Sequence, residues 1–229
     1  MKILSIIVLL LELFMLSGCS TKVEEKINKI GDLTFIGRSS VRIDLNDGRS
    51  IYIDPYMGSA TDYEKEGDLV LVTHQHSDHN NIAKVKLKDK GSVIQCPIDI
   101  KAGDSKTVDG IKITAVYAYN SNHAKESCCG FILEIDGVVI YHSGDTSLID
   151  EMATYKDFNI DYALICIDGV YNMDPEEAME VAALIKPRVV IPIHSAGSGL
   201  FDEENLKLFK YEASKVLYPS GSIELLKVN

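Results

Sequence analysis

The sequence predicts a layered α/β fold, and three features of the 229-residue chain indicate it. Short β-branched runs broken by Gly, Asp and Asn begin at Leu33, which is typical of strands joined by tight turns. The run Leu69–Val72 is apolar throughout, which indicates a strand buried on both faces. Helical segments interleave with strands mainly in the second half, and this pattern favours helices layered on sheets over an all-β sandwich.

The first predicted strands form a meander with one solvated face. Leu33–Ile36, Val41–Leu45 and Ser50–Asp54 alternate apolar and polar residues, and the turn Asn46-Asp47-Gly48 separates two of them. After Leu69–Val72, further strands are predicted at Ser92–Gln95, Ile111–Tyr119, Gly130–Ile135, Val138–His142, Tyr162–Ile167, Val189–His194 and Ser222–Lys227.

Asp174 marks the start of the clearest helix. It is a favourable N-cap residue, Pro175 suits the first helical position, and Glu177 completes a capping box. The helix is expected to end before Pro187, because a proline disfavours helical backbone in the preceding residue. The other predicted helices are Leu148–Tyr155 and Glu203–Ser214.

The N-terminus predicts an export signal. Lys2 precedes an apolar run interrupted only by Ser5 and Glu12, and Leu16-Ser17-Gly18-Cys19 resembles the bacterial lipobox, whose cysteine is lipidated. A transmembrane anchor is the alternative, but the run is short and Glu12 would be costly in a spanning helix. We expect a signal peptide at residues 1–18, lipidation of Cys19, a tether at 19–31 and one domain at 32–229. The protein would then be anchored in the bacterial cell envelope and face outside the cytoplasm.

The acidic composition excludes a general nucleic-acid-binding role. The formal net charge is −11, whereas a nucleic-acid grip needs a basic surface that displaces counterions. Anionic substrates remain compatible with this charge, because bound metal ions invert the local field. We therefore expect no nucleic-acid partner.

The cysteines after Cys19 are expected to be buried apolar residues. Outside the cytoplasm Cys96, Cys128, Cys129 and Cys166 could also pair, and the sequence does not specify a connectivity. None has a Cys-x-x-Cys partner, so we assign them no chemistry.

Residues 73–80, Thr-His-Gln-His-Ser-Asp-His-Asn, contain three of the six histidines and follow a buried strand. Alternate residues of a loop can point the same way, so His74 and His76 can bind one metal ion while Asp78 and His79 face a second position. Imidazole nitrogens suit zinc, iron and manganese, and a carboxylate adds a hard oxygen ligand. Asp78 is also a candidate catalytic residue that orients a metal-bound water or accepts its proton. The alternative, a polar loop whose histidines only form hydrogen bonds, fits this spacing poorly.

Three more candidate ligands follow predicted strands elsewhere in the chain. His123 comes after the strand at 111–119, Asp145 after the strand ending at His142, and His194 ends the run Val189–Ile193. Layered α/β folds build their sites from such strand-to-loop junctions, so we expect these side chains to complete the site.

Together these motifs resemble the metallo-β-lactamase superfamily. The resemblance rests on Thr73–His79, on His123, on Ser143-Gly144-Asp145-Thr146 and on Ile191-Pro192-Ile193-His194, and it extends from about Leu33 to the C-terminus. The segments Tyr141–Thr146 and Met173–Ala178 are similar to the branch of small metal-dependent hydrolases related to L-ascorbate-6-phosphate lactonase. This resemblance implies a four-layer αββα sandwich.

The resemblance also implies a site with two divalent ions, zinc or alternatively manganese or iron. His74, His76 and His123 would hold one ion, Asp78, His79 and His194 the other, and Asp145 would bridge them. His142, the remaining histidine, is expected to support the site or the fold without binding metal.

Hydrolysis is the implied chemistry, because two ions that share a water generate a hydroxide near neutral pH. His76 replaces the Glu of iron–oxygen reductases with this fold, and Asp145 replaces the Cys of common class B β-lactamases, which disfavours both activities. We expect a small-molecule ester, lactone or phosphodiester substrate. A phospholipid-directed phosphodiesterase at the membrane surface and a non-catalytic metal-binding lipoprotein are the alternatives.

Overall fold

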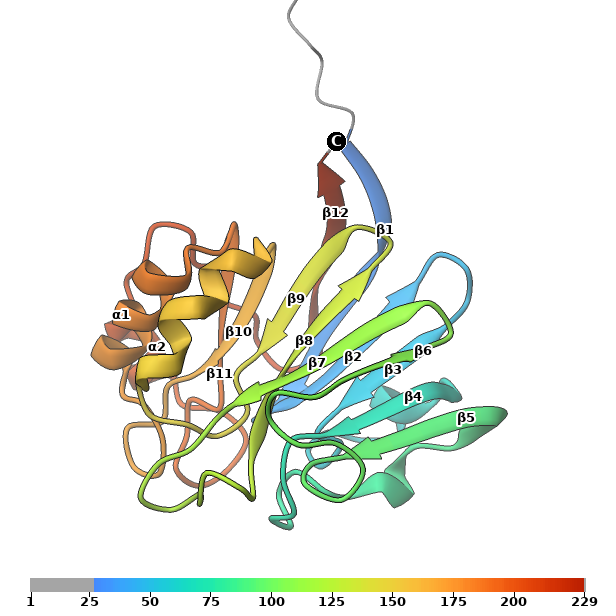
Figure 1. Cartoon of the computed structure of the whole chain (residues 1–229), viewed down its shortest axis with the longest axis horizontal. Coiled ribbons are helices and arrows are strands. Elements are labelled where there is room, and N and C mark those ends of the chain that lie inside the picture. The colour runs from blue at the N-terminus through green and yellow to red at the C-terminus, as the bar shows by residue number, and fades with distance from the viewer. Residues whose placement is uncertain (1–26, 229) are drawn as a thin grey trace, which may run out of the picture.

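The computed structural model describes residues 27–228, and the predicted signal peptide, Cys19 and the start of the predicted tether lie outside the described residues. Two six-stranded sheets pack face to face (Figure 1). In order along the first sheet, the strands are β12 (Gly221–Val228), β1 (Ile27–Gly37), β2 (Ser40–Leu45), β3 (Ser50–Ile53), β4 (Gly67–Val72) and β5 (Leu87–Gln95). In the second sheet they are β11 (Val189–Ile193), β10 (Tyr162–Cys166), β9 (Val138–His142), β8 (Cys129–Ile135), β7 (Ile111–Tyr117) and β6 (Ser105–Val108).

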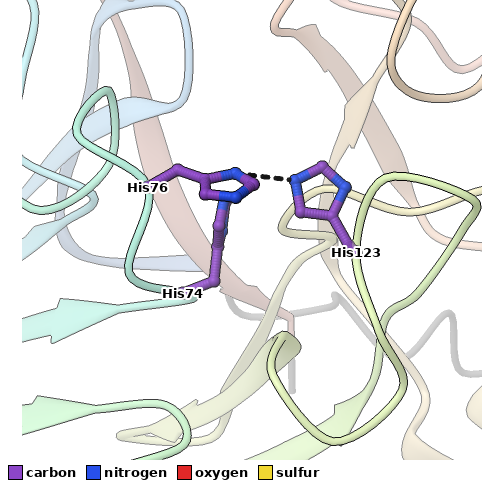
Figure 2. Close-up of side chains that lie close together, drawn as sticks. All are labelled: His74, His76 and His123. Atoms are coloured by element: carbon purple, nitrogen blue, oxygen red, sulfur yellow. Dashed lines mark hydrogen bonds between the residues drawn. The ribbon is translucent and has the colours of Figure 1, made fainter.

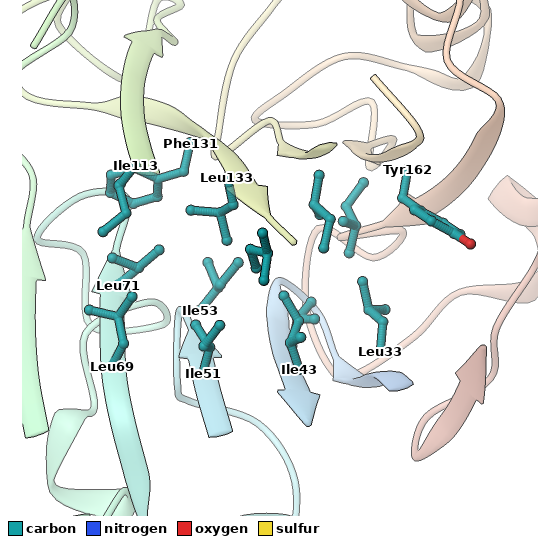
Figure 3. Packing of buried hydrophobic residues seen from close by; sticks show 14 of the residues in the cluster. Leu33, Ile43, Ile51, Ile53, Leu69, Leu71, Ile113, Phe131, Leu133 and Tyr162 are labelled. Atoms are coloured by element: carbon teal, nitrogen blue, oxygen red, sulfur yellow. The ribbon is translucent and has the colours of Figure 1, made fainter. Parts of the chain in front are cut away.

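The main hydrophobic core lies between the two sheets (Figure 3). Ile51 and Ile53 of β3 point into this core, whereas Tyr52 packs in a separate cluster on the outer face, as strand alternation requires. The strand β4 behaves in the same way, with Leu69 and Leu71 inside and Val70 and Val72 outside. The all-apolar run therefore forms a strand that is buried on both faces, as predicted.

Helices cover the outer faces unequally. Over the second sheet lie the α-helices α1 (Pro175–Ile185) and α2 (Glu203–Leu208) and the 3-10 helix η3 (Asp150–Phe158), which share an apolar cluster with β9 and β10. The first sheet is covered by short 3-10 helices, η1 (Ala60–Tyr63) and η2 (Ile82–Lys84). The architecture is the predicted αββα sandwich, with one thin outer layer.

Several element boundaries differ from the sequence prediction for identifiable reasons. The strand β1 begins at Ile27, inside the predicted tether, because it pairs with β12 down to Val228. The predicted helix Glu203–Ser214 ends at Leu208, since Ala213 and Lys215 form backbone hydrogen bonds with Val190 of β11. The predicted helix Leu148–Tyr155 is the 3-10 helix η3, and the exposed strand β6, which lacks an apolar pattern, was not predicted.

Parallel pairing places the functional loops together. The strands β3, β4 and β5 are mutually parallel, and so are β9, β10 and β11. The loops that follow parallel strands leave the same edge of a sheet, so each sheet directs several strand-end side chains to one end of the sandwich.

Two further expectations concern the membrane and the cysteines. None of the helices among residues 27–228 is long and apolar enough to cross a membrane. The four cysteines of this region are buried and unpaired, as expected for small apolar core residues.

Candidate metal centre

The structure gathers the predicted ligands into three overlapping groups. His74, His76 and His123 form one group, although His123 comes from the loop between β7 and β8 (Figure 2). The other two groups are His74, His79 and Asp145, and Asp78, His79 and His194. Within each group the candidate ligand atoms lie within 4.8 Å of one another, which is close enough to surround a metal ion.

Asp145 lies between the group of His74, His76 and His123 and the group of Asp78, His79 and His194. Its Oδ2 atom is 3.4 Å from Nε2 of His79, 3.6 Å from Nε2 of His194 and 3.6 Å from Nε2 of His123. One carboxylate oxygen is thus near imidazoles of both groups. This is the position that a bridging ligand requires.

A tight turn after β9 presents Asp145. Gly144 has a φ of +61°, and a Cβ atom there would come within 2.7 Å of the carbonyl oxygen of Cys129. Only glycine allows this approach to β8 at low cost. His142 holds the same turn, because its Nδ1 accepts a hydrogen bond from the Gly144 N–H at 3.2 Å and its Nε2 donates to the Ser39 carbonyl at 3.0 Å. Both nitrogens of His142 are occupied, so this residue supports the turn and is not a candidate ligand.

The outward-facing nitrogens of the candidate ligands are held by oxygen atoms. Nδ1 of His79 donates to Asp54 Oδ2 at 2.8 Å, and Nδ1 of His123 donates to Asn120 Oδ1 at 2.9 Å. His74 Nδ1 likewise forms a hydrogen bond with Thr73 Oγ1 at 3.1 Å, whereas His194 Nδ1 lies 3.0 Å from Asp168 Oδ2 as an ion-pair contact without hydrogen-bond geometry. A proton fixed on Nδ1 leaves the Nε2 lone pair free to bind a metal.

Several buried atoms of the candidate ligands have no hydrogen-bond partner, whereas Nε2 of His123 and Nδ1 of His76 form a hydrogen bond at 3.2 Å (Figure 2). Nε2 of His74 and His79, both ring nitrogens of His194 and Oδ1 of Asp145 form no hydrogen bond. Burying a polar atom without a hydrogen-bond partner costs free energy, and a cluster of such atoms on His and Asp side chains is typical of a metal-binding site. The residues present therefore fit divalent cations.

The electrostatics of the centre also favour cations. Burial lowers the pKa of His79, but the carboxylates of Asp145 and Asp54 outweigh it and raise that pKa well above its usual value. Burial raises the pKa of Asp145, but the neighbouring histidines outweigh it and hold that pKa well below its usual range. The centre thus stabilises positive charge among ionised carboxylates.

Asp78 forms an ion pair with a residue that the sequence analysis did not identify. Arg38 Nε and Nη2 contact Asp78 Oδ2 at 2.8 Å and 2.7 Å. Burial raises the pKa of Asp78, but the charges of His79 and Arg38 outweigh it and hold that pKa below its usual value. The Arg38 carbonyl also accepts a hydrogen bond from the His194 N–H at 2.7 Å, so Arg38 links Asp78 to the loop that carries His194.

A pocket of about 460 Å³ opens over the centre. It is lined by Arg38, His76, Asp78, Asn122, His123, Asp145, Tyr171 and Gly197. A small molecule can thus reach the exposed side of the candidate ligands.

The sequence analysis missed Arg38, Asp54, Asn120, Asp168 and Tyr171. Two of them follow the strand-end rule that located the ligands: Asp54 comes directly after β3, and Asp168 follows β10 after one intervening residue. No comparable signal marked Arg38 or Asn120, because turn residues of these types are common and their partners are distant in the sequence.

Comparisons with known proteins agree with this geometry. Residues 32–194 match the model of the Beta-lactamase superfamily domain. A UPF0173 metal-dependent hydrolase from Thermococcus kodakarensis is 35% identical over 70% of this chain and 82% of its own length. Another from Methanoculleus marisnigri is 34% identical over 84% of this chain and 96% of its own length. The structure of Igni18, a metallo hydrolase from Ignicoccus hospitalis, superposes with a TM-score of 0.68 and 26% identity, covering 87% of this chain and 99% of that one.

The family model covers the strands from β2 to β11 and every candidate ligand from His74 to His194. The chain therefore belongs to the metallo-β-lactamase superfamily and, within it, to the UPF0173 metal-dependent hydrolases.

Proposed function

We propose that this metal-dependent hydrolase is dinuclear and cleaves an ester, lactone or phosphodiester bond, with zinc as the expected metal and manganese or iron as alternatives. The observation that carries the proposal is the set of buried, unpaired ligand atoms on His74, His79, His194 and Asp145. Nδ1 of His79 and Nδ1 of His74 are hydrogen-bonded to oxygen atoms, so the Nε2 lone pairs of these two histidines are free to bind a metal ion.

Each candidate residue has a distinct role in the proposed centre. His74, His76 and His123 would hold the first ion, Asp78, His79 and His194 the second, and Asp145 both. Two divalent ions bound there would supply Lewis-acid activation of a water and of the scissile carbonyl or phosphoryl group.

The protein's own residues orient and tune this centre. Asp54 holds His79 in the tautomer that leaves Nε2 free, and the Asp168 carboxylate, 3.0 Å from Nδ1 of His194, favours the same tautomer there. Arg38 keeps Asp78 ionised, and a carboxylate with a lowered pKa is a weak base, so the ion pair favours Asp78 as a ligand over Asp78 as a proton acceptor.

We expect a water-soluble substrate in preference to a phospholipid of the anchoring membrane. The 11-residue strand β1 runs from Ile27 to the turn that carries Arg38 in the pocket wall, about 33 Å at the usual rise per residue. A lipid anchor on Cys19 would join the domain at the far end of this strand. This placement supports small lactones or soluble esters, in line with the similarity of Tyr141–Thr146 to the lactonase-related branch.

Metal analysis of protein produced from Ser20 onward tests the proposal directly. We expect two divalent ions per chain, and activity against a panel of esters, lactones and phosphodiesters that EDTA removes. Fewer than one ion per chain would contradict the dinuclear assignment.

The substitution Asp78→Ala distinguishes an enzyme from a non-catalytic metal-binding protein. An enzyme should lose turnover while circular dichroism shows an intact fold. Asp89→Ala is the matched control, because Asp89 is an exposed carboxylate of β5 that lies outside the pocket lining. Equal activity of the two variants would favour the non-catalytic alternative.

A further inference from the structure

Tyr171 differs from the other residues that line the pocket. Its side chain is 48% exposed, and it is the one large side chain of the lining that is neither charged nor an imidazole. Gly197 contributes no side chain to the same lining. A flat apolar surface therefore borders an otherwise polar pocket.

The backbone of Tyr171 is held on both sides. Its N–H donates to Asp168 Oδ1 at 2.7 Å, and its carbonyl accepts from Asn120 Nδ2 at 2.9 Å and from Asn122 Nδ2 at 3.1 Å. The loop that carries it is also packed against the next one, since a Cβ atom at Gly197 would come within 2.9 Å of Val170 Cγ2. An exposed side chain thus stands on a fixed backbone.

Two of the three residues that hold Tyr171 also contact candidate ligands. Asp168 lies 3.0 Å from Nδ1 of His194, and Asn120 accepts from Nδ1 of His123 at 2.9 Å. The tyrosine is therefore positioned relative to both proposed metal positions at once. An aromatic surface tied in this way to the reacting centre is suited to fix the position of a bound molecule.

We propose that Tyr171 is a specificity residue that packs against a ring in the non-reacting part of the substrate. The inference rests on the proposed function and narrows its substrate class to esters, lactones or phosphodiesters that carry a ring. The polar group of such a molecule lies at the ligands around Asp145, and its ring covers the exposed face of Tyr171 and removes apolar surface of both from water.

A matched pair of ligands tests this packing without requiring turnover. Phenylphosphonate and methylphosphonate carry the same metal-seeking group and differ by the ring. We expect the zinc-loaded full chain, purified in detergent, to bind phenylphosphonate about tenfold more tightly in calorimetric titrations. The substitution Tyr171→Ala should reduce this preference to about twofold, and Tyr171→Phe should keep it. Tyr218→Ala is the control, because Tyr218 is 59% exposed and its ring lies 5.2 Å from that of Phe201, outside the pocket lining.

The possible outcomes separate this inference from the proposed function. A tenfold preference that persists in Tyr171→Ala overturns the role of Tyr171, and a preference lost equally in Tyr171→Phe overturns packing against the ring. If the wild-type chain binds zinc and both phosphonates equally, the ring inference is wrong and the proposed function stands. If it binds neither zinc nor phosphonate, the proposed function fails and the inference fails with it.

Discussion

The two candidate metal positions differ in exposure and in the residues behind them. At the first position, formed by His74, His76 and His123, the side chain of His76 is exposed. The Nδ1 atoms of His74 and His123 contact the neutral side chains of Thr73 and Asn120. The second position includes His79 and His194, which are 0% exposed and backed by the carboxylates of Asp54 and Asp168. Carboxylates behind imidazoles make them more basic ligands, so we expect the second position to bind its ion more tightly.

The pKa values of the histidines show the same contrast. Burial lowers the pKa of His74 to about 2, whereas the pKa of His79 is raised by Asp145 and Asp54 against the effect of burial. An environment that stabilises a proton also stabilises a metal cation. We therefore expect the second position to hold its ion more tightly than the first.

The substitution Asp145→Ala should have the largest effect, because this residue is the proposed ligand of both positions and its loss should weaken metal binding at both. We expect hydrolytic activity to fall by roughly 10³-fold or more, since several kcal/mol of transition-state stabilisation depend on the ions. Metal content measured by mass spectrometry should fall below two ions per chain. Asp145→Asn, which keeps the shape, separates loss of charge from loss of packing; retention of both ions in both variants would refute the bridging role.

The substitution Asp54→Asn should weaken the second position selectively. The amide keeps an oxygen for the Thr73 hydroxyl but removes the charge behind His79, and such changes typically cost about 10- to 100-fold in metal affinity. Titration with Co²⁺, followed by its absorption spectrum, measures the two affinities. Asp89→Asn changes the net charge equally on an exposed strand, so the same loss in that variant would point to a general electrostatic effect.

A smaller effect is expected at the first position from Asn120→Ala. This change removes the acceptor behind His123 but no charge, so we expect a loss of affinity of about tenfold or less for the first ion. The second ion should be retained under the same chelator concentration. Loss of the second ion at a lower chelator concentration than the first would contradict the expectation that the second position binds its ion more tightly.

The smallest effect on the metal centre is expected from Asp174→Ala, because Asp174 is not a candidate ligand and lies outside the pocket lining. Asp174 accepts hydrogen bonds at 2.9 Å from the N–H groups of Glu176 and Glu177 at the start of α1. Loss of this cap should cost about 1 kcal/mol in the free energy of unfolding, measured by denaturant titration, with unchanged metal affinity. A change in metal affinity would show that α1 is coupled to the site.

Much of the fold was predictable because strand periodicity is local. The buried strand β4 and the capped helix α1 were placed correctly from their own residues. The helix predicted at Glu203–Ser214 was too long, because it ends at Leu208 and Ser214 pairs instead with Val190 of the edge strand β11. That competition between helix and sheet edge is not visible in the local sequence.

The candidate ligands were identifiable because their spacing along the chain carries the chemistry. His74, His76, Asp78 and His79 lie in one loop, and His123, Asp145 and His194 follow strands that the sequence already indicates. The sequence could not show which atoms of these residues are free to bind a metal. That depends on partners such as Asp54, which is 25 residues from His79.

The amino-acid sequence by itself determined most of the strands, the capped helix, the superfamily pattern and the candidate metal ligands. Only the tertiary structure decided how those residues are oriented and charged: Arg38 pairs with Asp78, Asp54 and Asp168 back the buried imidazoles, and Asn120 and Asp168 fix Tyr171 over the pocket. The physical reason is that ligand identity is a property of single residues at fixed spacing. Tautomer, ionisation and pocket shape arise from contacts across the two sheets, and the sheets must pack before those contacts exist.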